Sequence, residues 1–373
     1  MKPDFCVIGG GIAGLSIAAE LSSHTKVIVL EREQDLAYHT TGRSAALYSE
    51  LSAESTAVAL SKLARPFLVN PPDGFSEYPL HKDITCIFTA TDAEAEHIQS
   101  NAEKLDKPQI LDIDEMLAQV PVLRTGGTDI TAGLLEVDSF RIDVDALVQG
   151  YRNQVKRNGG TLRCQAEVSA LKQEKNGWRV TLANGDSIDT LRIINAAGAW
   201  GDVVAKMADV KPLGLSPLRR NIIVFDGPEN TDVSGWPAIA SITGAYYFLP
   251  EAGKLMGSSA DEVPSTPCDA QPEEYDVALA AHNIESATTL DIKHIHHKWA
   301  GLRTFSPDRQ LVVGYDTEKP EFFWFVGQGG FGIQISPAAA RAGALLAMEE
   351  SLSSDYLAAG VTVAALSPQR FTK

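Results

Sequence analysis

The sequence contains few cysteines and no closely spaced pair of them. The thiols among its 373 residues are Cys6, Cys86, Cys164 and Cys268. Structural zinc sites and disulfide frameworks use clustered cysteines, so this spacing predicts neither and is typical of a reducing compartment. A histidine cluster occurs at 294–297, but neighbouring strand positions point to opposite faces and no carboxylate or thiol stands at ligand spacing. We therefore expect no metal site.

Long apolar runs and an excess of basic residues are also absent. No stretch reaches the roughly twenty apolar residues that cross a bilayer, and no long apolar leader precedes the first strand-like run at 5–8. The formal net charge of -16 disfavours nucleic acid and anionic lipid as partners. We expect a cytoplasmic globular protein, and the missing G-x-S-x-G signature argues against acyl transfer.

Glycine, by contrast, is concentrated directly after the first apolar run. Residues 5–8 are followed by Gly9-Gly10-Gly11-Ile12-Ala13-Gly14, after which apolar residues recur at helical spacing. In a dinucleotide-binding turn Gly9 permits the tight exit from the strand, Gly11 lets the backbone approach a pyrophosphate, and Gly14 lets helix and strand pack closely.

The residues after this turn favour the nucleotide interpretation. A second strand-like run at 26–30 ends at Glu31, at the distance expected for a carboxylate that contacts ribose hydroxyls. A carboxylate there would repel a 2′-phosphate, which disfavours NADP. The alternative is a glycine turn that binds nothing, and the order of strand, turn, helix, strand and acid weakens it.

The rest of the chain mixes helical and strand patterns. Helices are predicted at 54–67, 92–105, 112–119, 143–158, 272–289 and 337–350. Asp92 is the expected cap of the second, and Pro337 is expected near the first turn of the last. Strands are predicted at 84–89, 161–165, 167–171, 192–195, 221–225, 245–249, 254–257, 311–314 and 322–327, with a hairpin at 178–189. The pattern predicts an α/β fold with an inserted α+β domain.

Several motifs, taken in order, resemble one flavoenzyme family. They are Gly9 to Gly14 with Glu31-Arg32, Thr41-Gly42-Arg43-Ser44-Ala45-Ala46, Asn195-Ala196-Ala197-Gly198-Ala199-Trp200, Trp299-Ala300-Gly301-Leu302-Arg303 and Gly329-Gly330-Phe331-Gly332. Together they resemble the D-amino acid oxidase (DAO) superfamily of FAD-dependent oxidoreductases, and within it D-arginine dehydrogenase and similar D-amino acid dehydrogenases. The match runs from end to end in the same order, which no single motif would establish.

The resemblance implies a Rossmann-like FAD-binding domain of the glutathione-reductase-2-like type. It also implies a substrate domain whose mixed sheet covers the flavin. The FAD-binding domain is expected at 1-50, 141-211 and 300-373, and the substrate-binding domain at 51-140 and 212-299. FAD is expected without a covalent link, because the cysteine that follows the Gly-Leu-Arg segment in covalently flavinylated relatives is absent here. The implied cofactor residues are Gly9, Gly11, Ile12, Ala13, Gly14, Glu31, Arg32, Thr41, Gly42, Arg43, Ser44, Ala45, Val168, Ala197, Gly198, Trp200, Gly301, Arg303, Gly329, Gly330, Phe331, Gly332 and Ile333.

For the substrate, the resemblance implies a carboxylate clamp of Arg220 and Arg303, with Tyr247 as a further donor. These three are the catalytic candidates, and a planar guanidinium suits the carboxylate of an α-amino acid because the two can form a bidentate pair. The other substrate-binding candidates are Leu47, Ser52, Cys86, Tyr246 and Gln334. Without the resemblance, Arg219 and Arg220 would be interpreted as a surface pair and the two tyrosines as core aromatics.

The sequence departs from D-arginine dehydrogenase at positions that concern the substrate side chain. Leu47 and Cys86 stand where a cation-binding group is expected. An uncompensated buried guanidinium is costly, so smaller or apolar D-amino acids are favoured over D-arginine. Whether Glu50 supplies the missing charge stays open.

The choice between oxidase and dehydrogenase rests on one lysine. Sarcosine-oxidase-like relatives use a lysine over the flavin, whereas here Leu255 takes the matching position. Lys254 is one residue away, which in a strand turns its side chain to the opposite face. This difference favours a dehydrogenase.

These features predict an FAD-dependent D-amino acid dehydrogenase. Hydride transfer to flavin N5 and hydrolysis of the imino acid would give a 2-oxo acid and ammonia, with electrons passed to a quinone-like or other acceptor. No general base stands out, and a neutral amine does not require a strong one. The alternatives are oxidation of a secondary amine or a 2-hydroxy acid, and an FAD-binding redox module without turnover.

Overall fold

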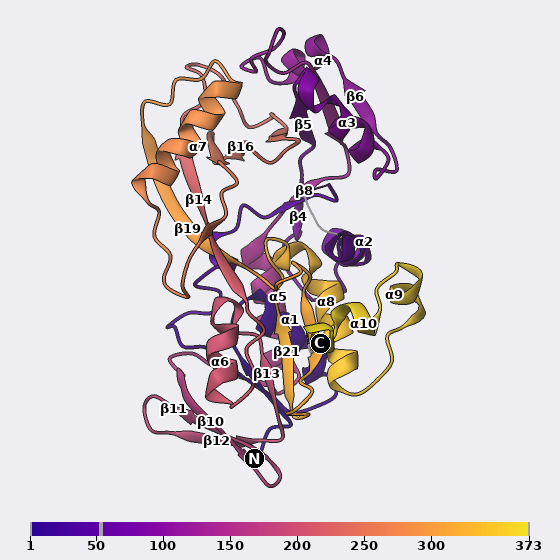
Figure 1. The fold of residues 1–373 in the computed structure, drawn as a ribbon, viewed down its shortest axis with the longest axis vertical. Coiled ribbons are helices and arrows are strands. Elements are labelled where there is room, and N and C mark those ends of the chain that lie inside the picture. Colours follow the sequence, from indigo (N-terminus) through magenta and orange to yellow (C-terminus); the bar gives the residue numbers. More distant parts are fainter. Residues whose placement is uncertain (1, 52–54, 372–373) are drawn as a thin grey trace.

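The computed structural model describes residues 2–51 and 55–371, which form two parts stacked along the long axis of the molecule (Figure 1). The lower part contains a six-stranded sheet in the order β20-β21-β13-β1-β2-β9. Its strands are β1 (Phe5–Ile8), β2 (Val27–Leu30), β9 (Thr161–Arg163), β13 (Arg192–Asn195), β20 (Val312–Tyr315) and β21 (Phe322–Val326). Neighbours run parallel except for β20 with β21. Strands from distant parts of the chain therefore meet in one sheet.

Each face of this sheet is covered by a different layer. In β1, Phe5 and Val7 lie in the core shared with the helices α1 (Ile12–Ser22), α5 (Val144–Arg157) and α8 (Gly332–Ala347). Cys6 and Ile8 face the opposite core, with α6 (Gly201–Met207) and the sheet of β10 (Val168–Glu174), β11 (Gly177–Leu182) and β12 (Ser187–Thr190). Burial on both faces explains why these strands are continuous apolar runs.

The upper part is built on a nine-stranded sheet in the order β18-β14-β17-β16-β15-β5-β7-β6, with β19 paired to β14. Its strands are β5 (Cys86–Ala90), β6 (Gln109–Leu111), β7 (Ala132–Glu136), β14 (Ser216–Phe225), β15 (Ala238–Ser241), β16 (Tyr247–Glu251), β17 (Lys254–Ser258), β18 (Val263–Pro264) and β19 (Ile295–Phe305). The pair β15 and β5 is parallel and the other neighbours are antiparallel. The helices α4 (Ile113–Gln119) and α7 (Glu274–Ala287) share a core with one face.

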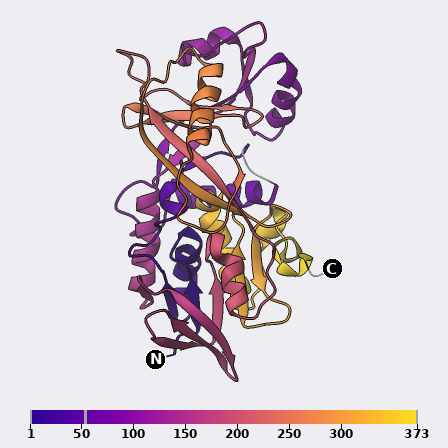
Figure 2. The same cartoon turned by 60° about the vertical axis from the view of Figure 1, so that its left-hand side comes forward.

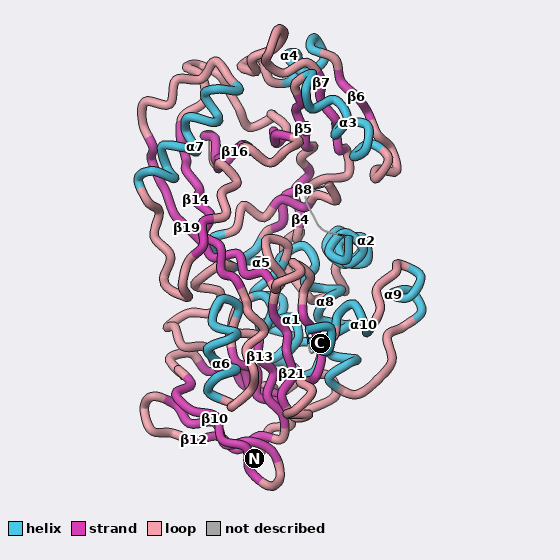
Figure 3. Tube along the Cα trace, in the orientation of Figure 1, coloured by secondary structure: helices cyan, strands magenta, loops and turns pink. Residues whose placement is uncertain are grey.

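Two long strands join the parts. β14 and β19 pair along most of their length and run together from the upper part down to the parallel sheet (Figures 2 and 3). A small sheet of β3 (Leu47–Tyr48), β8 (Phe140–Ile142) and β4 (His81–Asp83) lies between the parts (Figure 1). The large sheet is thereby fixed against the carboxyl ends of the parallel strands.

The predicted fold class is confirmed, because a parallel α/β part carries an inserted mixed-sheet part. The residue ranges of the two domains stay a prediction. Helix α2 (Ser55–Val69) falls in the range predicted for the substrate domain, yet its Leu60 and Leu68 pack in the core of α1 and α8. No helix in the described part of the chain combines the length and apolar character needed to cross a membrane.

Two helix starts were predicted wrongly. α8 begins at Gly332, so Pro337 lies inside it and not near its first turn. The glycine turn after β21 continues directly into the helix, and Phe331 provides its first carbonyl acceptor, for the N–H of Ile335. The segment predicted as one helix at 92–105 is a 3₁₀ turn followed by α3 (Ala95–Ala102). Thr91, not Asp92, caps it, because its N–H donates to the Glu94 carboxylate at 3.0 Å.

The contact between α1 and the turn before it gives a first prediction. A Cβ atom on Gly14 would lie 1.9 Å from the carbonyl oxygen of Gly9, which is fixed backbone. Gly14→Ala is therefore expected to lower the free energy of unfolding by about 2 kcal/mol or more, measured by urea unfolding. Gly235→Ala is the control, since nothing lies within 4 Å of its added Cβ. Equal stability of the two variants would contradict the prediction.

Candidate active site

A cavity of about 570 Å³ lies at the carboxyl ends of the parallel strands, beneath the large sheet. Its size is that of a small-molecule or cofactor site. It is lined by the turns that follow β1, β2, β13 and β21, by the loop 37–47, and by residues of β14, β15, β16 and β19. This is the place where open α/β sheets bind ligands.

The glycine turn after β1 is closed by contacts that leave no room for side chains. Gly9 has φ +112°, and an added Cβ would meet the Ala196 carbonyl oxygen at 2.5 Å. The N–H of Gly10 donates to Glu31 Oε2 at 2.7 Å. Glu31 therefore holds the turn in place in addition to lining the cavity.

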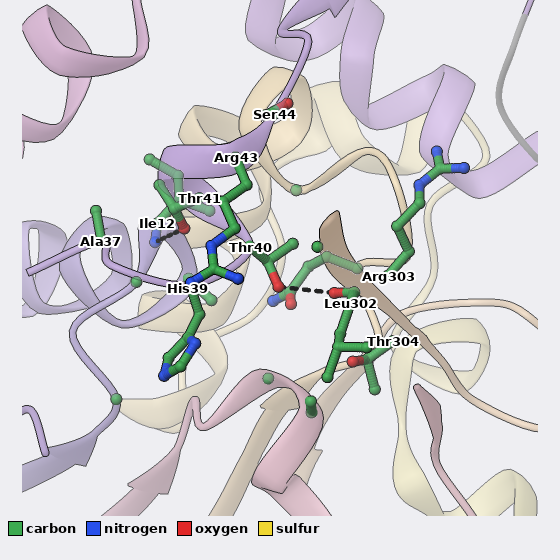
Figure 4. A pocket seen from close by; sticks show the side chains of 18 of the residues that line it. Ile12, Ala37, His39, Thr40, Thr41, Arg43, Ser44, Leu302, Arg303 and Thr304 are labelled. Atoms are coloured by element: carbon green, nitrogen blue, oxygen red, sulfur yellow. Dashed lines mark hydrogen bonds between the residues drawn. The ribbon is translucent and has the colours of Figure 1, made fainter. Parts of the chain in front are cut away.

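A hydroxyl group caps the helix that follows. The N–H of Ile12 donates to Thr41 Oγ1 at 3.0 Å, as Figure 4 shows. The same loop is tied to β19, because Thr40 Oγ1 donates to the Leu302 carbonyl at 2.7 Å and Trp299 Nε1 donates to the Arg43 carbonyl at 3.0 Å. These bonds place the loop across the cavity.

Arg43 lines the cavity, but its guanidinium is already bound by protein. It donates to the carbonyls of Ala270 at 2.9 Å and Ala300 at 3.0 Å and pairs with Asp269. The resemblance implies that Arg43 is a cofactor residue, which stays a prediction. In the structure its contacts join the loop to β19 and to the segment at 269–270.

The end of the cavity near β2 suits a nucleotide. Val168 and Trp200 line it, and the Arg32 guanidinium lies 4.8 Å from the centre of the Trp200 ring. Buried Glu31 supplies acceptors for ribose hydroxyls. Thr304 also lines the cavity, and its buried Oγ1 has no hydrogen-bond partner within residues 2–51 and 55–371. An orphaned hydroxyl and a close-packed glycine turn are what a bound dinucleotide would use.

The structure brings most of the predicted cofactor residues together. All of them line the cavity except Gly14, which packs against Gly9, and Gly42, which packs against Ala37. Their roles in binding FAD remain predictions.

Strand register places the two predicted clamp residues on one face. Arg220 of β14 stands opposite Gly301 of β19, and Leu218 stands opposite Arg303. Since residues two apart in a strand share a face, Arg220, Gly301 and Arg303 all face the cavity. Gly301 has no side chain, so both guanidinium groups fit there. The strand predicted at 221–225 in fact begins at Ser216 and includes Arg219 and Arg220.

Arg303 is a largely buried cation, with 18% of its side chain exposed, and has little compensation. Its guanidinium lies over Gly330, where an added Cβ would come within 1.3 Å of it. In the described ranges it donates no hydrogen bond, and its nearest carboxylate is Glu262 at 3.9 Å. Burial, and then the positive charge of Arg220, lower the pKa of Arg303 to about 9. The free cavity therefore lacks negative charge at this point.

Arg220 and Tyr247 complete this corner of the cavity. Arg220 lines it while donating to the carbonyls of Ala260 at 2.6 Å and Asp261 at 3.0 Å, which fix its orientation. Tyr247 of β16 also lines the cavity. Tyr246, one residue earlier, is buried on the opposite side, where its hydroxyl lies 2.8 Å from Thr89 Oγ1. Strand alternation thus separates the two tyrosines.

The remaining substrate candidates are placed differently from one another. Leu47 lines the cavity. Gln334 lines it too, although its amide is bonded to Ser49 and Ser61. Cys86 is fully buried and does not line the cavity, whereas Phe88 on the same face of β5 does. Ser52 lies outside the described residues.

Sequence reasoning missed the apolar lining under the sheet. Phe88, Ile222 and Ala240 line the cavity beside Leu47. Ile222 follows Arg220 at strand spacing, so alternation along β14 would have found it once the strand's true start was known. Phe88 and Ala240 depend on the pairing of β5 with β15, which the sequence alone does not reveal.

The lysine considered for oxygen activation lies elsewhere. Lys254 does not line the cavity, and its Nζ pairs with Asp226 and lies 3.1 Å from His296 Nε2. Leu255 is buried in the core beneath α7. His296 is thus part of a surface ion pair, and no group of metal-ligating side chains occurs in the parts of the chain that the structure describes.

A family model described as FAD dependent oxidoreductase (DAO) matches residues 4–346. The chain belongs to this family. It is 24% identical to the FAD-dependent oxidoreductase domain-containing protein 1 of Mus musculus, over 93% of this chain and 82% of that protein. It is also 24% identical to the glycerol-3-phosphate dehydrogenase 1 of Mycobacterium tuberculosis (strain CDC 1551 / Oshkosh), over 80% of this chain and 62% of that protein.

Solved structures show the same fold. L-proline dehydrogenase from P. horikoshii superposes with a TM-score of 0.82 at 20% identity, over 100% of this chain and 98% of that chain. Glycine oxidase from Geobacillus kaustophilus gives a TM-score of 0.82 at 18% identity, over 97% and 99%. This DAO-family oxidoreductase therefore uses FAD, and the cavity residues fit that cofactor.

A buried carboxylate lies across the sheet from Cys86. Glu136 of β7 is 2% exposed, and its Oε1 accepts the Glu50 N–H at 2.7 Å. Its Oε2 has no hydrogen-bond partner among the residues that the structure describes. Burial raises the pKa of Glu136 to about 7, against the opposing effect of the Ser49 and Glu50 hydrogen bonds. Glu50 itself pairs with Lys62 at 3.2 Å.

Glu136 should make stability depend on pH. Its pKa is about 7 when folded and 4.5 in the unfolded reference, so the folded state binds the proton more tightly. The free energy of unfolding should therefore fall by about 3 kcal/mol as pH rises from about 4.5 through about 7. Glu136→Gln should lose this fall and exceed the parent in stability at about pH 8, measured by denaturant unfolding. Exposed Glu103→Gln is the control, and an unchanged pH profile for Glu136→Gln would refute the assignment.

Proposed function

We propose that the chain is an FAD-dependent dehydrogenase of D-amino acids, similar in its reaction to D-arginine dehydrogenase. The observation that supports it best is the guanidinium of Arg303, which lies beside Arg220 in the cavity and has no carboxylate nearer than Glu262 at 3.9 Å within the described residues. Two largely buried cations on one face of the paired strands β14 and β19 attract an anion, and an α-carboxylate has the geometry to pair with a guanidinium. The structural relatives named for proline and glycine are consistent with such a substrate.

The chain's contribution is to hold the substrate. Arg303, Arg220 and the Tyr247 hydroxyl bind the carboxylate, which leaves the Cα hydrogen facing the floor of the cavity. The sheet above excludes water, because Phe88, Ile222 and Ala240 are apolar. FAD, when bound, supplies the hydride acceptor. No side chain at this end of the cavity is needed as a strong base if the amine enters neutral.

The lining favours a small or apolar substrate side chain. Leu47, Phe88 and Ile222 offer no charge. Glu50 is engaged by Lys62 and by the Tyr48 hydroxyl, so it does not offer a free carboxylate for a guanidinium. An unpaired cation in this environment would be costly, which argues against D-arginine.

Dehydrogenase activity is proposed over oxidase activity because of Lys254. Its ammonium is held by Asp226 outside the cavity, so it is not available above the flavin. Electrons would then pass to a quinone-like acceptor. The cytoplasmic location expected from the sequence belongs to the same proposal.

The first test is anaerobic bleaching of the flavin in the purified holoenzyme. D-Amino acids with small or apolar side chains should bleach the visible absorbance rapidly, and air should restore it slowly. L-Amino acids and 2-hydroxy acids are the controls within the same panel. Bleaching by 2-hydroxy acids alone, or by none of the panel, would overturn the proposal.

The second test changes the clamp. Arg303→Lys keeps the charge but loses the planar pair of donors, so KM for every oxidised amino acid should rise by roughly ten- to hundredfold. Flavin content should stay unchanged. Arg179→Lys, on an exposed hairpin, is the control. A KM equal to that of the parent would remove Arg303 from the clamp.

A further inference from the structure

One carboxylate oxygen lies close to three guanidinium groups at the edge of the cavity. Glu262 Oε1 is 3.6 Å from Arg220 Nη2, 3.9 Å from Arg303 Nη1 and 3.0 Å from Arg309 Nη2. The distance to Arg309 is that of a hydrogen bond, and the other two are longer than hydrogen bonds. Glu262 thus attracts both clamp arginines but does not fill their hydrogen-bonding positions.

The backbone that carries Glu262 is fixed on both sides. Arg220 donates to the carbonyls of Ala260 and Asp261, and the Asp261 carboxylate accepts from the side chain and the N–H of Asn221. Directly after Glu262, β18 pairs with β14. Its carboxylate can therefore move by side-chain rotation alone. The side chain is 33% exposed, which gives it room to turn outward.

A substrate carboxylate and Glu262 would meet the same guanidinium nitrogens. Like charges this close repel, and each lowers the affinity of the arginines for the other. Arg303 meets no other carboxylate within ion-pair distance in the described part of the chain. Loss of Glu262 would therefore leave the clamp more positive and its attraction for an added anion stronger.

We propose that Glu262 is an internal counter-ion of the clamp, which competes with the substrate carboxylate and moves towards Arg309 when substrate binds. This proposal rests on the proposed carboxylate clamp. It makes Glu262 a residue that sets affinity: it keeps the empty site from holding two uncompensated cations and limits how tightly substrate and the anionic product bind.

The test compares Glu262→Gln with the parent holoenzyme. Acetate and benzoate are titrated into the oxidised enzyme, and binding is followed by the change in the visible flavin spectrum. We expect Kd for both anions and KM for the best amino acid to fall by roughly three- to tenfold, with flavin content unchanged. Glu262→Asp keeps the charge on a shorter side chain. Its Kd and KM should lie between those of the parent and those of Glu262→Gln. A residue that only holds the arginines in place would give the opposite sign, a rise in Kd and KM.

Glu273→Gln is the matched control. Glu273 pairs with Arg219, which precedes Arg220 and faces the other side of the sheet. Loss of the Glu273 charge should therefore leave Kd and KM unchanged. Parent enzyme that binds neither carboxylate would refute the clamp itself. Parent enzyme that binds them, together with unchanged or weaker binding in Glu262→Gln, would overturn the counter-ion role and leave the clamp intact.

Discussion

The placement of two positive charges on one face of β14 and β19 is the constraint on which the site depends. Arg220 and Arg303 are separated by Gly301 and share a cavity, and burial there lowers the pKa of Arg303. A folded protein tolerates this only if anions are near or arrive as ligands. The fold supplies one carboxylate at a distance, Glu262, and leaves the remaining hydrogen-bonding positions of the two guanidinium groups open. The proposed preference for carboxylates rests on this electrostatic imbalance.

The long strands that carry the arginines also position the cofactor end. β19 holds the loop 37–47 through the Leu302 carbonyl and the Trp299 indole, and that loop in turn caps α1 through Thr41. The same strand therefore connects the corner with Arg220 and Arg303 to the glycine turn after β1. A family member with this arrangement has its two binding regions joined by a rigid element, which suits a reaction that depends on positioning.

Ionic groups away from this face have other roles. Arg219 pairs with Asp276 and Glu273 on the opposite side, where α7 covers the sheet. Lys254 and His296 share Asp226 at the surface. Adjacent residues of one strand thus differ in function, since alternation sends one side chain to the cavity and the next to the far core.

Local patterns in the chain were enough to predict the parallel strands, the glycine turns and the family motifs. These patterns consist of an apolar run, a turn that only glycine allows and a helix start, which lie within a few residues of one another. The resemblance also named Arg220, Arg303 and Tyr247. The side-chain contacts around those groups depended on the tertiary structure. Arg43 binds Asp269, far away in sequence, and Glu262 lies beside three arginines. Strand pairing and packing also determined three further features: the length of β14, the burial of Cys86 and Tyr246, and the start of α8 at Gly332. Strand register and long-range side-chain contacts are set by the whole core, so no local pattern of residues encodes them.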